Sequence, residues 1–338
     1  MNKKGFVQVL VGVGILALLF YKIDFHKVAE VVRGVNIFLF ALAGVSYLCY
    51  NLFMAYRLSY LLRKMGVGEG VGNSVSLKFS DSFFAHFAGM LASDVTPGRV
   101  GFFLVPYFLR NRTGCRISEG MAAILAPQGI EFILKVAGGF VGLVFFTGVI
   151  SVDGSGAGGV GGASLLLPLC VGGGVFLGLG AVILWVVWTA ESRSANFLAK
   201  IPFAFVRRFE AEFQKMKEKS FSIRETVPLI LVIYFVCWVL LAVQWQLIGL
   251  SLGVTAAELG FLAYFLLHPL ITILRFVPVT VSGLGLMEGA TAVVFELLGV
   301  GPAVGLSFAL LVRLNMILVD CVGLKGVFSS EFRLKNNA

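Results

Sequence analysis

The chain of 338 residues is 58% hydrophobic and only 13% charged, whereas roughly a quarter of the residues in an average soluble domain are charged. This composition excludes a water-soluble protein and indicates an integral membrane protein. The formal net charge of +9 fits cytoplasmic loops that face anionic lipid, and it gives no reason to expect nucleic acid as a partner.

Uncharged runs at 5–21, 34–56, 154–190 and 226–257 are each at or near the ~20 residues that a helix needs to cross a membrane. None shows the ~10-residue alternation of apolar and polar residues that is typical of outer-membrane strands. The longest polar stretch, 191–225, is too short to bury a core of its own. We therefore expect an all-α membrane protein with a single transmembrane domain over residues 1–338.

Two stretches of membrane-span length are interrupted by Pro, Gly and small polar residues, at 93–101 (SDVTPGRVG) and at 278–289 (PVTVSGLGLMEG). Backbone groups freed by such a break find no water in hydrocarbon, so irregular backbone survives there only in protein or beside a polar cavity. Paired interruptions are typical of transport sites. The residues expected to permit these two tight tips are Pro97, Gly98, Gly101, Ser282, Gly283 and Gly285.

Basic residues orient the chain, because short basic loops remain cytoplasmic. Eight Lys/Arg residues lie in 191–225, and Arg110, Arg112 and Arg116 follow the first break. We place both loops inside, and the acidic, Gly-rich 151–162 and 251–260 loops outside. The N- and C-termini are then cytoplasmic, in a multi-pass protein of the cell (inner) membrane.

This orientation predicts six full spans, at 5–21, 35–62, 121–150, 165–190, 227–250 and 303–323, with an amphipathic interfacial helix at about 23–35. It also predicts two re-entrant hairpins that enter from opposite faces, at 71–110 and 261–301, as in an inverted repeat. The parts are an N-terminal helix pair (1–70), a first repeat (71–190), a cytoplasmic basic segment (191–225) and a second repeat (226–325). Two unrelated kinks in ordinary helices are the alternative interpretation.

Ionisable residues near the expected midplane are costly and usually face a partner or a watery cavity. Arginine offers forked donors that suit phosphate, so an anionic head group is the expected ligand. The candidate substrate-binding residues are Asp94, Arg99, Glu131, Arg275, Glu288 and Arg313. The alternative for Arg313 is a structural pair with Glu288 or Glu131. Lys135 and Asp320 are also candidates for the midplane, but we expect them to extend toward an interface. Arg57 either extends toward an interface, which we favour, or reaches a lipid phosphate.

The sequence lacks the common motifs for nucleotide binding, serine hydrolysis and zinc-dependent hydrolysis. There is no GxxxxGK[ST] loop, GxSxG elbow or HExxH pair, and the three histidines are not spaced as metal ligands. The five scattered cysteines fit small core residues. We expect no catalytic residue, metal or cofactor and no ATP hydrolysis within the chain. If transport needs energy, that energy must come from a gradient or a partner.

Several blocks carry a family resemblance: residues 278–289, 297–300 (LLGV) and Val312-Arg313 in the second half, and 96–101 (TPGRVG) and 107–109 (YFL) in the first. They resemble the lysylphosphatidylglycerol synthase transmembrane-region family, which includes flippase-like proteins, over nearly the whole chain. The resemblance implies the lipid-translocating half without the soluble aminoacyl-transferase domain. The chain departs from the family pattern at Phe102, Val105 and Pro127-Gln128, which leaves room for a different lipid, whereas Glu131 matches the pattern.

The sequence therefore predicts a lipid flippase or transporter, not an enzyme, that binds an anionic phospholipid or polyprenyl-phosphate head group between the two tips. Its expected partners are membrane lipids, and a second copy of the chain is a further candidate. The alternative is an intramembrane transferase, or an accessory subunit of one, that acts on polyprenyl-phosphate-linked sugars and uses Asp94 or Glu131 as acid or base. A helical scaffold, the third hypothesis, leaves the buried charges unexplained.

Overall fold

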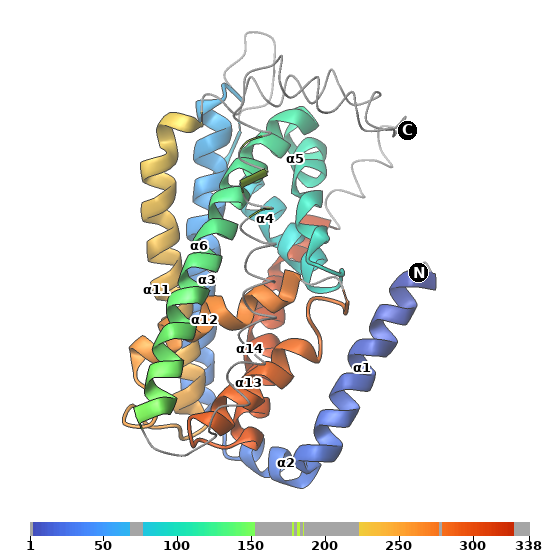
Figure 1. Cartoon of the computed structure of the whole chain (residues 1–338). Coiled ribbons are helices and arrows are strands. Elements are labelled where there is room, and N and C mark those ends of the chain that lie inside the picture. The colour runs from blue at the N-terminus through green and yellow to red at the C-terminus, as the bar shows by residue number, and fades with distance from the viewer. Residues whose placement is uncertain are drawn as a thin grey trace.

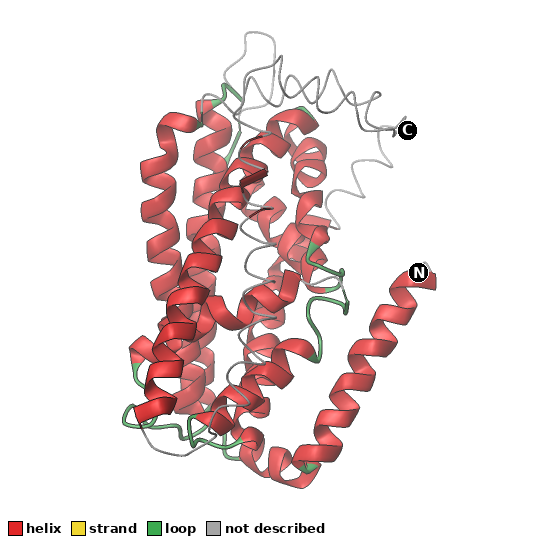
Figure 2. Cartoon of the chain, in the orientation of Figure 1, coloured by secondary structure: helices red, strands yellow, loops and turns green. Residues whose placement is uncertain are grey.

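The computed structural model describes residues 3–67, 77–152, 223–276 and 279–327, with isolated positions at 178, 181–182 and 185. Every element in these parts is a helix, and irregular segments join the helices (Figure 2). Apart from these isolated positions, the predicted span at 165–190 lies outside the described residues, as does nearly all of the basic segment at 191–225.

Four helices are long and apolar enough to cross a membrane: α3 (Ile37–Lys64), α6 (Ile117–Val152), α11 (Val227–Ser251) and α14 (Pro302–Asp320). Asn36 begins α3, since its Oδ1 accepts hydrogen bonds from the backbone N–H groups of Phe38 and Leu39. Proline lies in the first turn of α11 and α14, where its missing N–H costs nothing. The short helix η2 (Arg224–Thr226) precedes α11, and the short helix η4 (Cys321–Gly323) follows α14.

The N-terminal pair stands beside the bundle. Helix α1 (Lys3–Ile23) is followed by α2 (Phe25–Arg33) after a bend of 89°, as Figure 1 shows. Asp24, at the bend, has φ 73° and accepts a hydrogen bond from His26 N. In α2, which lies where the amphipathic helix was predicted, Val28 packs against Ala292 and Leu306. Counting this bent pair as one span, the described residues contain up to five candidate spans.

Two interrupted units complete the bundle. The first consists of α4 (Phe79–Asp94), η1 (Val100–Leu104) and α5 (Val105–Thr113), and the second of α12 (Phe261–Thr272), η3 (Ile273–Phe276) and α13 (Leu286–Leu297). The 16 residues of α4 extend only about 24 Å and the 12 of α12 about 18 Å, short of the ~30 Å of hydrocarbon. In Figure 1 the first unit occupies the upper half of the molecule and the second the lower half.

The second break differs from the predicted 278–289 at its carboxyl end, because α13 already begins at Leu286. Gly285 is its N-cap, with φ 84°, and Glu288 Oε2 accepts a hydrogen bond from Gly285 N at 2.7 Å. The glutamate at the third helical position therefore starts the helix as in a capping box. Gly289, predicted to belong to the tip, is helical.

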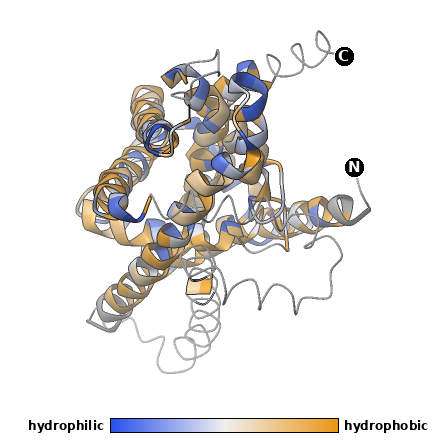
Figure 3. Cartoon of the chain, turned by 90° about the horizontal axis from the view of Figure 1, so that it is seen from above, coloured by the Kyte–Doolittle hydropathy of each residue, from blue (hydrophilic) through white to orange (hydrophobic). Residues whose placement is uncertain are grey.

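The core combines aromatic side chains with close helix contacts. The rings of Trp245, Phe308 and Phe295 pack in series, edge to face and then tilted, with centroids 5.4 and 5.0 Å apart. On α14, a Cβ added at Gly305 would lie 2.7 Å from Phe295 Cβ on α13, so glycine sets the spacing of this pair. Viewed from above, most of the helical ribbon carries hydrophobic residues, as expected for helices in a membrane (Figure 3).

Candidate functional site

The first tip is a tight turn closed by Thr96. Its hydroxyl donates to Ala92 O at 2.9 Å and accepts from Gly101 N at 2.8 Å. Gly98 and Arg99 both have φ 58°, a conformation that is easy for glycine and costly for arginine. A Cβ on Gly101 would collide with the Ala92 carbonyl, so only glycine lets η1 pack on the end of α4.

The second tip also uses the left-handed region. Ser282, Gly283 and Gly285 have φ values of 46°, 70° and 84°. A Cβ on Gly283 would lie 2.9 Å from Arg275 Cα, so the chain folds back closely on η3. The small residues predicted to permit the two tips lie at their turns.

The two tips meet through their main chains. Ser282 N donates to Thr96 O at 3.2 Å, and Pro97 and Val281 form an isolated antiparallel bridge. These contacts satisfy polar groups that the breaks leave without helical partners. Segments almost 190 residues apart in sequence therefore form one junction, the "tip junction" (Thr96, Pro97, Val281, Ser282).

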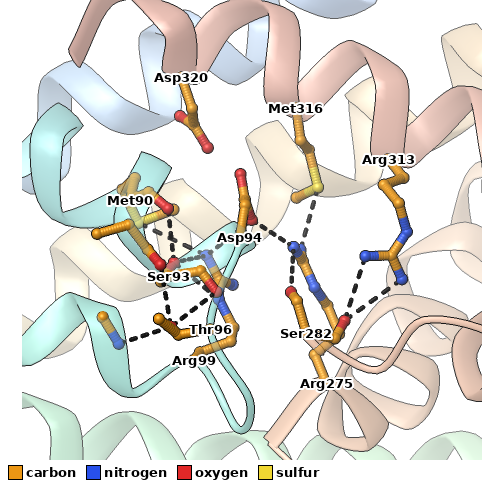
Figure 4. Close-up of polar contacts among 12 residues, drawn as sticks. Met90, Ser93, Asp94, Thr96, Arg99, Arg275, Ser282, Arg313, Met316 and Asp320 are labelled. Atoms are coloured by element: carbon orange, nitrogen blue, oxygen red, sulfur yellow. Dashed lines mark hydrogen bonds and ion pairs between the residues drawn. The ribbon is translucent and has the colours of Figure 1, made fainter. Parts of the chain in front are cut away.

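A buried ion pair holds the tip junction from one side. Arg275 Nη2, on η3, lies 2.8 Å from Asp94 Oδ1 at the end of α4, and Arg275 also bonds Ser282 Oγ at 3.4 Å (Figure 4). Both side chains are 3% exposed. Because removing one partner of a buried pair leaves an unpaired charge, this contact ties the first unit to the second.

A second ion pair joins α13, in the second unit, to α14. Arg313 Nε is 2.6 Å from Glu288 Oε1, and both Nη atoms of Arg313 donate to Ser282 O at 3.3 Å. The alternative predicted for Arg313, a pair with Glu288, is confirmed. Both arginines thus have protein partners at the tips, and their predicted contact with substrate remains a prediction.

Arg99 differs from these two arginines. Its Nε and Nη2 donate to Ser93 Oγ at 3.3 and 3.1 Å, and Nη2 lies 3.9 Å from Asp94 Oδ1. None of the described residues accepts a hydrogen bond from its Nη1. The side chain is 13% exposed, so Arg99 keeps donor capacity while its position is set by Ser93.

Arg99 lines a cavity of about 60 Å³ between the first tip, α3 and α6, which has room for a few water molecules. Its polar lining residues are Arg99, Gln128, Glu131 and Tyr50; the aromatic ones are Phe102, Phe103, Phe132 and Phe276. A neighbouring cavity of about 40 Å³ shares Tyr50, Met54 and Glu131 and extends to Lys135, Tyr234 and His268. We call the two together the Arg99 cavity.

Charges around the Arg99 cavity are mainly positive. Glu131 Oε1 lies 2.6 Å from Lys135 Nζ, which also lies 4.8 Å from the centroid of the Phe276 ring. Arg57 is 2% exposed and donates to Tyr234 Oη, which lines the cavity. Three cations, Arg57, Arg99 and Lys135, therefore surround one carboxylate, Glu131, an arrangement suited to an anion.

The expectation that Lys135, Asp320 and Arg57 extend toward an interface was wrong. Lys135 pairs one helical turn from Glu131, and Asp320 is 0% exposed and accepts from Tyr47 Oη at 3.0 Å. Each has a polar partner inside the bundle, which removes the reason to reach for solvent. Asp320 was among the charges expected near the midplane, although an interfacial position was favoured for it, and it is buried.

A usable signal for this region exists in the sequence. Tyr47 and Asn51 are one turn apart on a hydrophobic helix, and both bond Asp320. His86 Nε2 lies 3.0 Å from Asn51 Oδ1. Polar residues spaced i, i+4 on an apolar helix indicate a shared buried partner. No three His, Cys, Asp or Glu residues in the described ranges are placed to hold a metal ion.

Fold and site together define a multi-pass helical membrane protein in which two interrupted helical units meet beside buried ion pairs. The family model described as lysylphosphatidylglycerol synthase TM region matches residues 5–323. The chain belongs to this family, as the sequence blocks predicted. Comparison with curated proteins and with solved structures finds no match.

Proposed function

We propose that this protein is a flippase that binds the anionic head group of a membrane lipid in the Arg99 cavity and moves it between leaflets. The observation that carries the proposal is Arg99 itself, which is held at the first tip with an Nη1 donor left over and lines a cavity with a surplus of cations. A phosphate there would gain a charge-assisted hydrogen bond that water otherwise supplies.

The cost of flipping explains why such a cavity is needed. A charged head group moved through hydrocarbon loses its hydration, and this penalty makes spontaneous exchange slow. Arg99, Gln128 and Tyr50 offer polar contacts in place of water. Phe102 and Phe132 line the same cavity and suit the apolar part of a lipid. The acyl or isoprenoid chains would stay in the bilayer while the head crosses.

The remaining candidate residues receive a supporting role in this proposal. Asp94, Arg275, Glu288 and Arg313 hold the tip junction, and Glu131 pairs with Lys135 and offsets one of the positive charges at the cavity. The two interrupted units would act as re-entrant hairpins from opposite faces, the two halves of an inverted repeat, and opening the cavity alternately to either leaflet would require the tips to move.

The test uses the purified protein in sealed vesicles with a fluorescent anionic phospholipid and an impermeant quencher. Arg99→Gln should slow translocation roughly tenfold or more, because hydrogen bonds to charged groups contribute about 1.5–3 kcal/mol. Arg110→Gln is the matched control, since Arg110 is exposed on α5 and should keep the wild-type rate. Wild-type rates in Arg99→Gln would refute the proposal.

A second variant separates binding from folding. Arg99→Gly removes the guanidinium group but suits the left-handed φ of 58°. We expect its melting temperature to stay near that of the wild type while translocation is lost. A fall in both would mean that Arg99 acts through the structure of the tip.

One observation favours the alternative, an intramembrane transferase. The Glu131 carboxylate lines the cavity beside Arg99, where an acid or base would act on a phosphate-linked sugar. Incubating the detergent-solubilised protein with polyprenyl-phosphate-sugar donors and lipid acceptors distinguishes the two. A covalent product that Glu131→Gln abolishes indicates the transferase, whereas transport requires sealed vesicles.

A further inference from the structure

Two carboxyl groups face each other at the centre of the bundle, outside the Arg99 cavity lining. Asp94 ends α4, and Asp320 ends α14, with the side chains directed toward one another (Figure 4). The side chain of Asp94 is 3% exposed, and Asp320 is 0% exposed.

The hydrogen bonds of Asp94 are incomplete. Its Oδ1 accepts from Arg275 at 2.8 Å, but its Oδ2 is buried and has no donor within the part of the chain that the structure describes. A buried carboxylate oxygen without a donor is costly. Something must supply a hydrogen to this atom.

No cation of the described residues forms an ion pair with Asp320. Its Oδ2 accepts from Tyr47 Oη at 3.0 Å and its Oδ1 from Asn51 Nδ2 at 3.4 Å, both neutral donors. Among the described residues no Lys, Arg or His nitrogen forms a salt bridge with it. An ionised Asp320 would be an unpaired buried charge opposite a second carboxylate, an arrangement that interacting carboxyl groups avoid by sharing a proton.

We infer that Asp94 and Asp320 form a proton-binding site in which one proton lies between the two carboxyl groups. That proton would give Asp94 Oδ2 the donor it lacks and would neutralise Asp320. The ion pair with Arg275 keeps the remaining negative charge on Asp94. Such a pair titrates as one unit.

The charged and titratable groups that face this site come from several elements. Arg275 on η3 and Arg99 at the first tip favour the ionised form of Asp94, at 2.8 and 3.9 Å. Tyr47 on α3 bonds Asp320 directly, and His86 on α4 reaches it through Asn51. Only Asp94 is paired with a cation, so the proton's loss places the uncompensated charge on Asp320.

Loss of the proton has a defined mechanical consequence. The facing carboxylates would repel each other across the contact between α4 and the end of α14. That contact is close, since a Cβ on Gly323 would collide with the carbonyl of Phe87 on α4. Deprotonation therefore opposes the packing of α14 on α4 next to the tip junction.

The test is infrared spectroscopy of the purified protein in lipid bilayers, titrated from acidic to alkaline pH. Exposed carboxyl groups are ionised at neutral pH, so a carbonyl band of a protonated carboxylic acid, shifted in D₂O, reports a buried one. We expect such a band at pH 7 in wild type and its loss in Asp320→Asn, whose amide can donate to Asp94 Oδ2. Glu296→Gln, at an exposed carboxylate on α13, is the control and should keep the band.

Thermal unfolding supplies a readout that needs no spectral assignment and no lipid transport. Because folded protein would hold a proton that the unfolded chain releases, wild-type stability should fall as pH rises, and Asp320→Asn should remove this contribution to the fall. A folded wild type without the band at pH 7, or an unchanged band in Asp320→Asn, would overturn the inference. So would an identical pH dependence of the two melting temperatures.

Discussion

The three arginines predicted to bind substrate, Arg99, Arg275 and Arg313, have different surroundings in the structure. Arg275 and Arg313 each pair with a carboxylate and bond Ser282 at the tips, whereas Arg99 retains a donor beside a cavity. The cost of charge in a membrane identified all three from the sequence. Their partners could not be read from it, because the Arg275–Asp94 pair joins residues 181 positions apart and depends on how the tips pack.

The Glu288–Arg313 pair gives a stability prediction at this scale. Glu288→Gln should lower the free energy of unfolding by about 3–5 kcal/mol, because the buried Arg313 charge loses its partner. The double variant Glu288→Gln/Arg313→Gln should lose less than the sum of the two single variants. Thermal or denaturant unfolding in detergent measures both. If the free energy of unfolding of Glu288→Gln lies within ~0.5 kcal/mol of the wild-type value, the Glu288–Arg313 pair does not stabilise the fold.

At the scale of elements, the two helix breaks could be predicted from the sequence, but the residues at which the second break ends could not be placed as well. Pro97, Gly98 and Ser282 signalled breaks because they disfavour a continuous helix. The carboxyl end of the second break was misplaced because the capping role of Glu288 was not recognised, although Gly285 three residues earlier fits the pattern. Recognising it would have placed the start of α13 correctly.

Glycine substitutions test whether the first tip packs as described. Gly101→Ala should destabilise the protein by more than ~1–3 kcal/mol, since its Cβ would overlap the Ala92 carbonyl, which cannot move without distorting α4. Gly114→Ala is the matched control: its φ of 69° strains alanine, but nothing lies within 4 Å, so we expect a loss near 1 kcal/mol. Equal decreases in melting temperature, relative to wild type, for Gly101→Ala and Gly114→Ala would contradict the packing described for the first tip.

At the scale of the whole molecule, composition was enough to predict an all-helical membrane protein, and the family match agrees. Five of the six predicted spans coincide with helices α1, α3, α6, α11 and α14, and the sixth lies outside the described residues. The meeting of the two tips was a hypothesis from inverted-repeat logic. Sequence alone could not establish it, because the contact between Thr96 and Ser282 is made by main-chain atoms.

Cysteine labelling in intact cells tests the proposed orientation. Lys78→Cys and Arg116→Cys, at the two ends of the first unit, should both resist an impermeant maleimide added outside. Ala257→Cys and Glu296→Cys, at the ends of the second, should both react; all four positions are exposed. Native Cys115 is a poor competitor because burial raises the pKa of its thiol. If one end of a unit reacts with the outside reagent and its other end does not, that unit crosses the membrane and is not re-entrant.

The most direct test of the account is a disulfide across the tip junction, introduced as Pro97→Cys and Val281→Cys in a chain whose five native cysteines are replaced by serine. The antiparallel bridge brings these positions together, within the range that a disulfide spans. Translocation of a fluorescent anionic lipid is then measured in oxidised and reduced vesicles. The account predicts that the crosslink forms, that it stops translocation, and that reductant restores it. Failure of the crosslink to form, or equal rates with the tips locked and free, would contradict it.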